Sequence, residues 1–120
     1  MRINQIDYDA GQPVDGYGAG YFRLGTEMHE GPLAILPGGV VPWRGFEDME
    51  TLISRHTEFD VVFFGTGDDI AALPIQATQQ LDAVDVGYEL MSTPSACRTY
   101  NVLLSEGRRV ALAVIPVDNV

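Results

Sequence analysis

Hydrophobic and polar residues alternate along the first third of the chain and recur at helical spacing further on. The stretch YFRL at residues 21–24 places Phe22 and Leu24 on one face, which is the period of two that a half-buried strand shows. The stretch PLAILP at 32–37 predicts a short buried strand, and the Pro-Gly-Gly at 37–39 predicts a turn. Strands and turns are therefore expected in this part of the chain.

Three amphipathic helices are predicted from apolar residues that recur at spacings of three and four. The first begins after Gly45, where acidic residues fill the turn that the helix dipole favours. The second begins at Pro74, and the third follows the N-cap candidate Thr93 with Pro94 at its first position and Gly107 as C-cap. The residues expected to face inward are, helix by helix, Phe46, Met49, Leu52, Ile53 and His56; Ile75, Thr78, Leu81 and Val84; and Ala96, Tyr100 and Leu103, with Leu104 as a further candidate.

Three more strands alternate with the second and third helices. Residues 60–64 (DVVFF), 86–91 (VGYELM) and 109–117 (RVALAVIPV) supply them, and the first and last have the apolar runs of strands buried on both faces. The C-terminal half therefore has the order βαβαβ, which predicts three strands in one sheet covered by helices. We expect a three-layer α/β fold.

Composition narrows the function more than the periodicity does. The chain has 120 residues, 46% hydrophobic and 20% charged, which fits one globular domain. Its net charge is −10, and all seven basic residues are arginines. Such a chain has no basic face for nucleic acid or anionic membranes. Because it has no lysine, Walker A nucleotide binding, pyridoxal chemistry and Schiff-base aldolase chemistry are excluded.

The cysteine and histidine content also sets limits. A single cysteine, Cys97, excludes an internal disulfide and a CxxC pair, and two histidines without an HExxH motif make a zinc site unexpected. No metal and no cofactor are predicted. Residues 1–16 lack the apolar run of a secretory signal, and the longest apolar run, 110–115, is too short to cross a bilayer. We expect a cytoplasmic protein without a transmembrane segment.

The glycine-rich turn that follows the buried strand DVVFF is a candidate binding loop, because open α/β sheets bind ligands at strand ends. Gly65 and Gly67, with Thr66 between them, could offer backbone N–H groups to an anion. Asp68 and Asp69 would repel a phosphate, and the third glycine of a dinucleotide motif is missing. A tight structural turn and the lip of a pocket both remain open, and the two aspartates are either a solvated turn or carboxylates for acid-base or Mg²⁺ chemistry.

Cys97 and Arg98 raise the question of a reactive thiol. A neighbouring cation and a helix start lower a thiol pKa, but Cys97 lies four residues after Thr93, where the dipole effect has weakened. We expect Cys97 to pack in the core. Arg98 either closes over the GTG loop to contact a ligand or partner, or forms a salt bridge with Asp68, Asp69 or Glu89. Trp43, between turn residues, is either an interface anchor or the edge of a core.

Beyond these local patterns, the chain resembles a family of uncharacterised small bacterial and archaeal proteins, which also includes the mitochondrial NADH:ubiquinone oxidoreductase (complex I) assembly factor three. The resemblance covers residues 17–117 and is most specific at GTG, 65–67, and at ACRTYNVLLSEGR, 96–108. It implies a single three-layer α/β domain with a central mixed β-sheet over 17–117, preceded by an N-terminal extension at 1–16. The stretches that carry it are residues 16–43, 63–68 and 92–117.

The resemblance brings no agreed catalytic residues with it, so no catalytic role is assigned. It predicts a non-enzymatic interaction or assembly module whose partner is a protein, such as a membrane-complex subunit or another assembly factor, and the acidic surface would steer a basic partner. The alternative is an anion-binding protein or enzyme that uses the GTG loop and Arg98. A regulatory oligomer is a third possibility, and the oligomeric state stays open. The residues that match the motifs, as candidates for ligand or partner binding, are Gly65, Thr66, Gly67, Arg98, Thr99, Tyr100 and Asn101.

Overall fold

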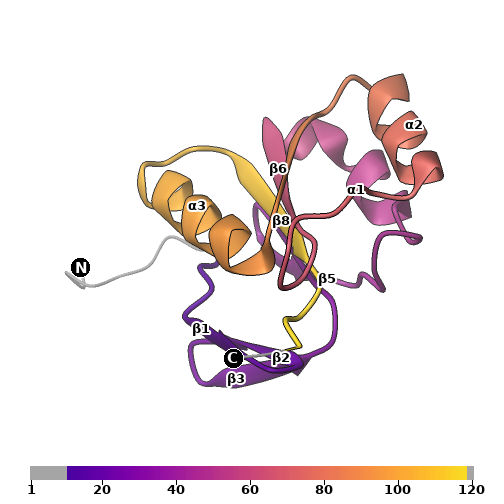
Figure 1. Ribbon diagram of the computed structural model, residues 1–120. Helices are drawn as coiled ribbons and strands as arrows, with labels where there is room; N and C mark the ends of the chain where they lie inside the picture. The colour runs from indigo at the N-terminus through magenta and orange to yellow at the C-terminus, as the bar shows by residue number, and fades with distance from the viewer. Residues whose placement is uncertain (1–10, 119–120) are drawn as a thin grey trace.

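Two β-sheets and the helices packed on them make up the computed structural model, which describes residues 11–118 (Figure 1). The strands are β1 Gly16–Gly18, β2 Tyr21–Leu24, β3 Glu27–Glu30, β4 Leu33–Leu36, β5 Gly39–Val41, β6 Val61–Gly65, β7 Gly87–Met91 and β8 Val110–Val114. The helices are α1 Glu50–Ser54, α2 Ile75–Ala83 and α3 Thr93–Ser105, with a 3₁₀ turn at His56–Glu58. Strands β1, β2 and β3 form a small antiparallel sheet, and the other five form the larger one.

The larger sheet is mixed and has the strand order β5-β4-β8-β6-β7. Strand β6 runs parallel to both β7 and β8, whereas β4 is antiparallel to β8 and to β5. In this register Gly65 lies opposite Met91 on one side and Val114 on the other, so the carboxyl ends of three parallel strands meet. The predicted mixed α/β fold is confirmed, with the three C-terminal strands in one sheet.

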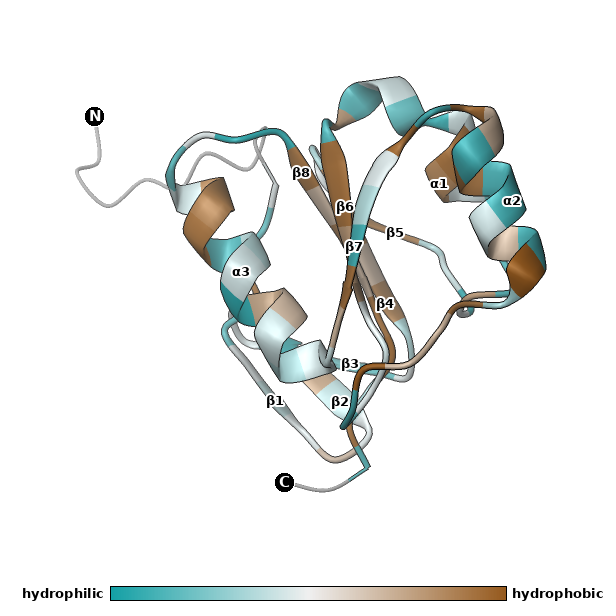
Figure 2. Ribbon diagram, turned by 45° about the horizontal axis from the view of Figure 1, so that its top comes forward, coloured by the Kyte–Doolittle hydropathy of each residue, from teal (hydrophilic) through white to brown (hydrophobic). Residues whose placement is uncertain are grey.

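Three layers follow from the two faces of the larger sheet, as Figure 2 shows. Helices α1 and α2 cover one face, where Leu52 and Leu81 pack with Ala111 and Ala113 of β8. Helix α3 and the small sheet cover the other face, where a second cluster includes Tyr100, Phe22 and Leu112. All five residues of β8 are buried, because successive side chains enter opposite clusters.

Helix α3 ends where the sequence predicts. Gly107 has φ +80°, and its N–H donates to the carbonyl of Leu104 at 3.0 Å, while the N–H of Arg108 donates to that of Leu103 at 3.0 Å. This pair of hydrogen bonds is the Schellman motif, which needs a left-handed residue at this position. At the other end Ser92 is the N-cap and Thr93, the expected N-cap, is already the first helical residue.

Two helix predictions need correction. The first helix begins at Glu50 and not after Gly45, because residues 46–49 form a turn in which Asp48 accepts a hydrogen bond from the N–H of Arg44 at 3.0 Å. Ile75, expected on the inner stripe of α2, is 68% exposed, because the buried stripe of the helix runs through Ala77 and Leu81 instead.

The N-terminal extension predicted for residues 1–16 falls partly outside the described residues. Of the part inside, Val14 belongs to the core cluster beneath α3 and is 6% exposed. Gly11 is also buried, with φ +122°. Residues 11–16 thus lie against the domain. No helix within residues 11–118 has the length and apolar character needed to cross a membrane.

Candidate functional site

The GTG turn lies at the point where the carboxyl ends of β6, β7 and β8 meet. The N–H of Thr66 donates to the carbonyl oxygen of Met91 at 2.9 Å, and the N–H of Gly67 donates to Oγ1 of Thr93 at 2.9 Å. The hydroxyl of Thr66 lies 2.8 Å from the carbonyl oxygen of Asp69 and accepts from the N–H of Ala71 at 2.8 Å. The two amides that an anion would require are therefore used inside the fold.

Thr93 joins this turn to the end of the last strand. Its N–H donates to the carbonyl of Gly67 at 2.8 Å, and its hydroxyl donates to the carbonyl of Ile115 at 2.7 Å while accepting from the N–H of Gly67. The N–H of Ile115 in turn donates to the carbonyl of Gly65 at 3.0 Å. Thr93 is fully buried. From the sequence it is recognisable only as a capping residue, because a lone threonine gives no sign of partners so far along the chain.

Close packing explains the first glycine of the turn. A Cβ placed on Gly65 would lie 2.6 Å from Cγ1 of Val114 and 2.8 Å from Cα of Thr93. Gly67 has a different requirement, because its φ of +101° lies in the region that favours glycine. The GTG sequence thus fits a structural turn, one of the two readings that the sequence left open.

A hollow of about 640 Å³ lies beside the turn. Its lining residues include Thr66 and Gly67, and three of the others, Asp68, Asp69 and Asp118, are acidic. Asp68 accepts a hydrogen bond from the N–H of Asp118 at 3.0 Å. The lining holds no basic residue, so the potential in this hollow opposes an anion.

Arg98 lines a different hollow, of about 290 Å³, between α3 and residues 14–17. Its neighbours there include Asp15, Tyr17 and Val102. The guanidinium is exposed, and its hydrogen bond is a long one to Oγ of Ser95 at 3.5 Å. Among residues 11–118 it forms no salt bridge, so the expected pairing with Asp68, Asp69 or Glu89 is not found.

Two other motif residues on α3 hold the beginning of the described chain. Asn101 accepts from the N–H of Val14 at 2.9 Å through Oδ1 and donates to the carbonyl of the same residue at 2.7 Å through Nδ2. The hydroxyl of Tyr100 donates to the carbonyl of Gln12 at 2.9 Å, and its ring is fully buried. Thr99 is half-buried beside them. The polar groups of Tyr100 and Asn101 are therefore occupied by the protein's own backbone.

Cys97 packs in the core, as predicted. It is 4% exposed and belongs to the cluster under α3. Burial raises the pKa of the thiol to about 12, because a thiolate would lose its hydration there. The thiol is protonated at neutral pH, and Arg98, which faces solvent, does not activate it.

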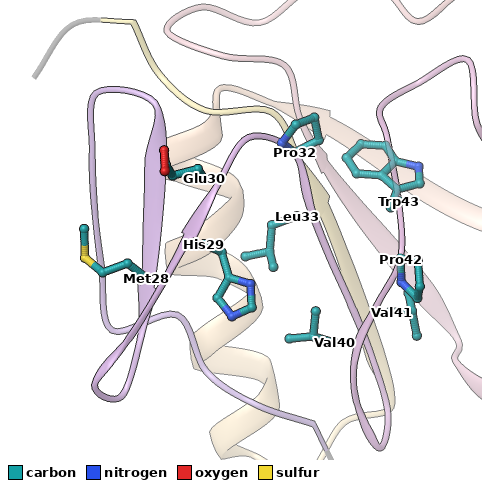
Figure 3. Close-up of a pocket in the computed structure, with 9 residues that line it drawn as sticks. All are labelled: Met28, His29, Glu30, Pro32, Leu33, Val40, Val41, Pro42 and Trp43. Atoms are coloured by element: carbon teal, nitrogen blue, oxygen red, sulfur yellow. The ribbon is translucent and has the colours of Figure 1, made fainter.

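A third hollow, of about 520 Å³, lies between β3 and the β5 end of the large sheet (Figure 3). Met28 and His29 border it on one side and Val40 on the other. Trp43 also lines it but is 6% exposed, and its ring packs edge-on against Phe46 with centroids 5.2 Å apart. Of the two roles considered for Trp43, the structure shows the edge of a core.

Metal binding has no support in the described part of the chain. Residues 11–118 contain no group of three His, Cys, Asp or Glu side chains arranged to hold an ion. His56 lies in the 3₁₀ turn with Nδ1 2.8 Å from the carbonyl oxygen of Ile53, and His29 is on β3, in the other sheet.

The fold defines a class that is known from solved structures. An outer membrane protein from Bartonella henselae superposes with a TM-score of 0.82 at 31% identity, covering 92% of this chain and 99% of that one. The solution structure of a Bordetella pertussis protein, described as an Mth938-like domain, superposes with a TM-score of 0.72 at 27% identity, covering 99% and 94%. The chain therefore has the Mth938-like α/β fold.

Residues 14–115 match a family described as a protein of unknown function (DUF498/DUF598), and the chain belongs to that family. An uncharacterised protein of Rhodobacter capsulatus is 47% identical over 117 residues, which cover 98% of this chain and 94% of that one. The human NADH dehydrogenase [ubiquinone] 1 alpha subcomplex assembly factor 3 is 31% identical over 124 residues, which cover 96% of this chain and 67% of that one. The predicted membership of the assembly factor's family is confirmed.

Proposed function

We propose that this protein is a non-enzymatic interaction module that assists the assembly of a respiratory membrane complex by binding one of its subunits or another assembly factor. The observation that carries the proposal is the 31% identity to the human assembly factor across nearly the whole of this chain. Similarity over the full domain favours a shared mode of action over a shared fold alone. The proposed place of action is the cytoplasm, at the surface of the membrane that holds the complex.

The chemistry of the motif residues supports a binding role. The amides of Thr66 and Gly67, the hydroxyl of Tyr100 and the amide group of Asn101 are all paired within the fold. Polar groups that are hydrogen-bonded within the protein stabilise the fold, and they are poorly placed to bind or transform a substrate. A rigid surface with few reactive groups is what a binding module requires.

Arg98 is the motif residue that we place in the interface. It is exposed, it carries no ion pair within the described residues, and Tyr17 and Val102 beside it are 40% and 50% exposed. Arginine next to exposed apolar and aromatic side chains is common at the centres of protein interfaces.

The anion-binding alternative is less well supported, because it needs Arg98 and the GTG loop to form one site. The two line separate hollows. The acidic residues around the GTG hollow would also oppose the ligand.

Affinity capture from gently solubilised membranes and from cytosol tests the proposal, with wild type, Arg98→Ala and Arg108→Ala as baits and mass spectrometry as the readout. Arg108 is the matched control, because it is an exposed arginine in the loop after α3. We expect subunits or assembly factors of a respiratory complex with wild type and Arg108→Ala, and several-fold less with Arg98→Ala. Absence of any such protein from the wild-type capture would contradict the proposed function.

A further inference from the structure

Residues 70–75 form an exposed apolar segment that runs from the GTG turn into the first residue of α2. Its sequence is IAALPI, and six apolar residues in succession are unusual outside a core strand. Ile70 is 64% exposed and Ile75 is 68% exposed, which makes them the two most exposed large hydrophobic residues of the described chain. Scattered exposed apolar residues need no explanation, but a contiguous run of this kind marks an interaction surface.

The segment is held in position although it is exposed. Leu73 is partly buried and packs against the core cluster beneath α1 and α2. Pro74 has φ −53° and ψ 143°, an extended conformation in which the ring restricts φ. At the other end the N–H of Ala71 donates to Oγ1 of Thr66 at 2.8 Å. Figure 1 shows the segment as part of the loop that leads from β6 to α2.

The backbone of the segment is also open. Within residues 11–118 the amides of Ile70, Ala72 and Leu73 have no hydrogen-bond partner, and the segment belongs to neither sheet. A preformed chain segment outside both sheets, with unpaired amides and exposed aliphatic side chains, can bind a partner segment without first paying for its own ordering.

The surrounding charge selects the partner. Between His56 and Arg98 the sequence has no basic residue and seven acidic ones, of which Glu58 and Asp60 form ion pairs with Arg55 and Arg109. Of these, Asp68 and Asp69 directly precede the segment and are exposed. A partner that covers Ile70 and Ile75 comes within reach of these carboxylates, so basic residues on it are favoured and acidic ones are opposed.

We propose that residues 70–75, the docking segment, bind a stretch of a partner protein that combines aliphatic side chains with Arg or Lys. This inference rests on the proposed function, adds a contact surface apart from the hollow that Arg98 lines, and names the chemistry of the partner. A second copy of this chain is disfavoured, because it would place Asp68 and Asp69 of one molecule against those of another. An anionic membrane is disfavoured for the same reason.

The first test uses a defined probe and the purified protein. Fluorescein-labelled LRLRLRLR is titrated by fluorescence anisotropy, with LELELELE and SRSRSRSR as charge and apolarity controls, and the site is mapped by ¹H–¹⁵N chemical shifts. We expect LRLRLRLR to bind at least about tenfold more tightly than either control, to lose affinity with added salt, and to shift the amides of residues 68–76.

Variants distinguish binding at the docking segment from non-specific binding of the peptide elsewhere on the protein. Ile70→Ser/Ile75→Ser is expected to weaken LRLRLRLR binding by about tenfold or more, since each lost aliphatic contact contributes severalfold to affinity. Met28→Ser is the matched control, because Met28 is 57% exposed and lies on β3 between Glu27 and Glu30. Binding that is undetectable, that is unchanged in the double variant, or that shifts amides elsewhere would overturn the proposal.

The capture experiment distinguishes this inference from the proposed function on which it rests. If wild type and Ile70→Ser/Ile75→Ser retain the same respiratory partner in equal amounts, the docking segment is wrong and the proposed function stands. If wild type retains no such partner, the proposed function fails, and the peptide titration still decides whether the segment binds a basic, apolar sequence.

Discussion

Two strand-to-helix connections begin at the carboxyl ends of neighbouring parallel strands in the five-stranded sheet, and they differ in how they are anchored. Strand β7 passes to α3 through Ser92 alone, and the first residue of α3, Thr93, is buried and hydrogen-bonded. Residues 66–74 connect β6 to α2, and only their beginning is fixed by such bonds. The GTG turn belongs to the anchored part, and the docking segment belongs to the exposed part.

The difference shows that a glycine-rich motif can serve the packing of a turn. The GTG turn has the composition of a ligand loop, yet its polar groups bond to Met91 and Thr93. The neighbouring residues 70–75 match no motif, yet they carry the exposed apolar surface. The predictions below test this contrast, beginning with the anchored side.

The largest effect is expected at Gly65. Gly65→Ala places a methyl group within 2.8 Å of the backbone of α3, and such overpacking costs about 3 kcal/mol of unfolding free energy. Urea denaturation measures the loss. Gly16→Ala is the control, because its added Cβ meets only the guanidinium of Arg23, at 3.3 Å, which can move away. Equal stabilities of the two variants would show that the turn is not tightly packed.

Thr93→Val tests the hydrogen bonds of the same turn. The substitution keeps the shape of the side chain but leaves the N–H of Gly67 and the carbonyl of Ile115 without their partner, at a cost of about 2 kcal/mol. Thr99→Val is the matched control, because Thr99 is half-buried and makes no hydrogen bond through its hydroxyl within the described residues. The measurement is again urea denaturation, and amide exchange at Gly67 should accelerate only in Thr93→Val.

Most of the fold could be predicted from sequence because its strands and helices have clear periods. Residues 60–64 and 109–117 are apolar on both faces, and the structure places them side by side at the centre of the sheet. The errors fall where packing overrides the local pattern: Phe46 and Met49 pack from a turn, and Ile75 shares the spacing of the inner stripe yet points to solvent.

The site was less predictable, because its important contacts join residues far apart in sequence. The GTG turn and Arg98 were recognised as candidates, but the partner of Gly67 is Thr93, 26 residues further on, and the partner of Asn101 is Val14, 87 residues earlier. Period and composition carry no information about such pairs. The docking segment is not recognisable from sequence for another reason, since an apolar run before a helix is equally typical of a core.

Alkaline pH should weaken the anchored side. The thiol of Cys97 has a pKa of about 12 in the folded protein and about 8.5 when unfolded. Between these pH values only the unfolded chain releases the thiol proton. The contribution of Cys97 to the free energy of unfolding is therefore complete below about pH 8.5. It is lost as the pH rises, by up to about 1.4 kcal/mol per pH unit. Burial also raises the pKa of Tyr100, which adds to the loss above about pH 10.

The check on Cys97 is urea denaturation of wild type and Cys97→Ala from pH 7 to 10. We expect the variant to be the less stable protein at pH 7 and to show the shallower decline above pH 8.5. Parallel declines would contradict the assigned burial of the thiol.

Tyr100→Phe should lower the free energy of unfolding by less, because it affects only the contact between α3 and the residues around Gln12. It removes the hydrogen bond to the carbonyl of Gln12 and leaves the buried ring in place, at a cost of about 1 kcal/mol. Amide exchange near Gln12 should increase while that of β6 stays slow. Tyr88→Phe, on the edge strand β7, is the control, because that ring is half-buried and its hydroxyl makes no hydrogen bond within the described residues.

The smallest effect on stability is expected in the docking segment itself. Ile70→Ser/Ile75→Ser should change the unfolding free energy by less than about 0.5 kcal/mol, because both side chains are mostly in water already. Leu73→Ala, in the same segment, should cost about 1 kcal/mol or more, because Leu73 packs on the core. A large loss in the isoleucine variant would mean that these side chains stabilise the fold, and their exposure would no longer indicate a surface kept for a partner.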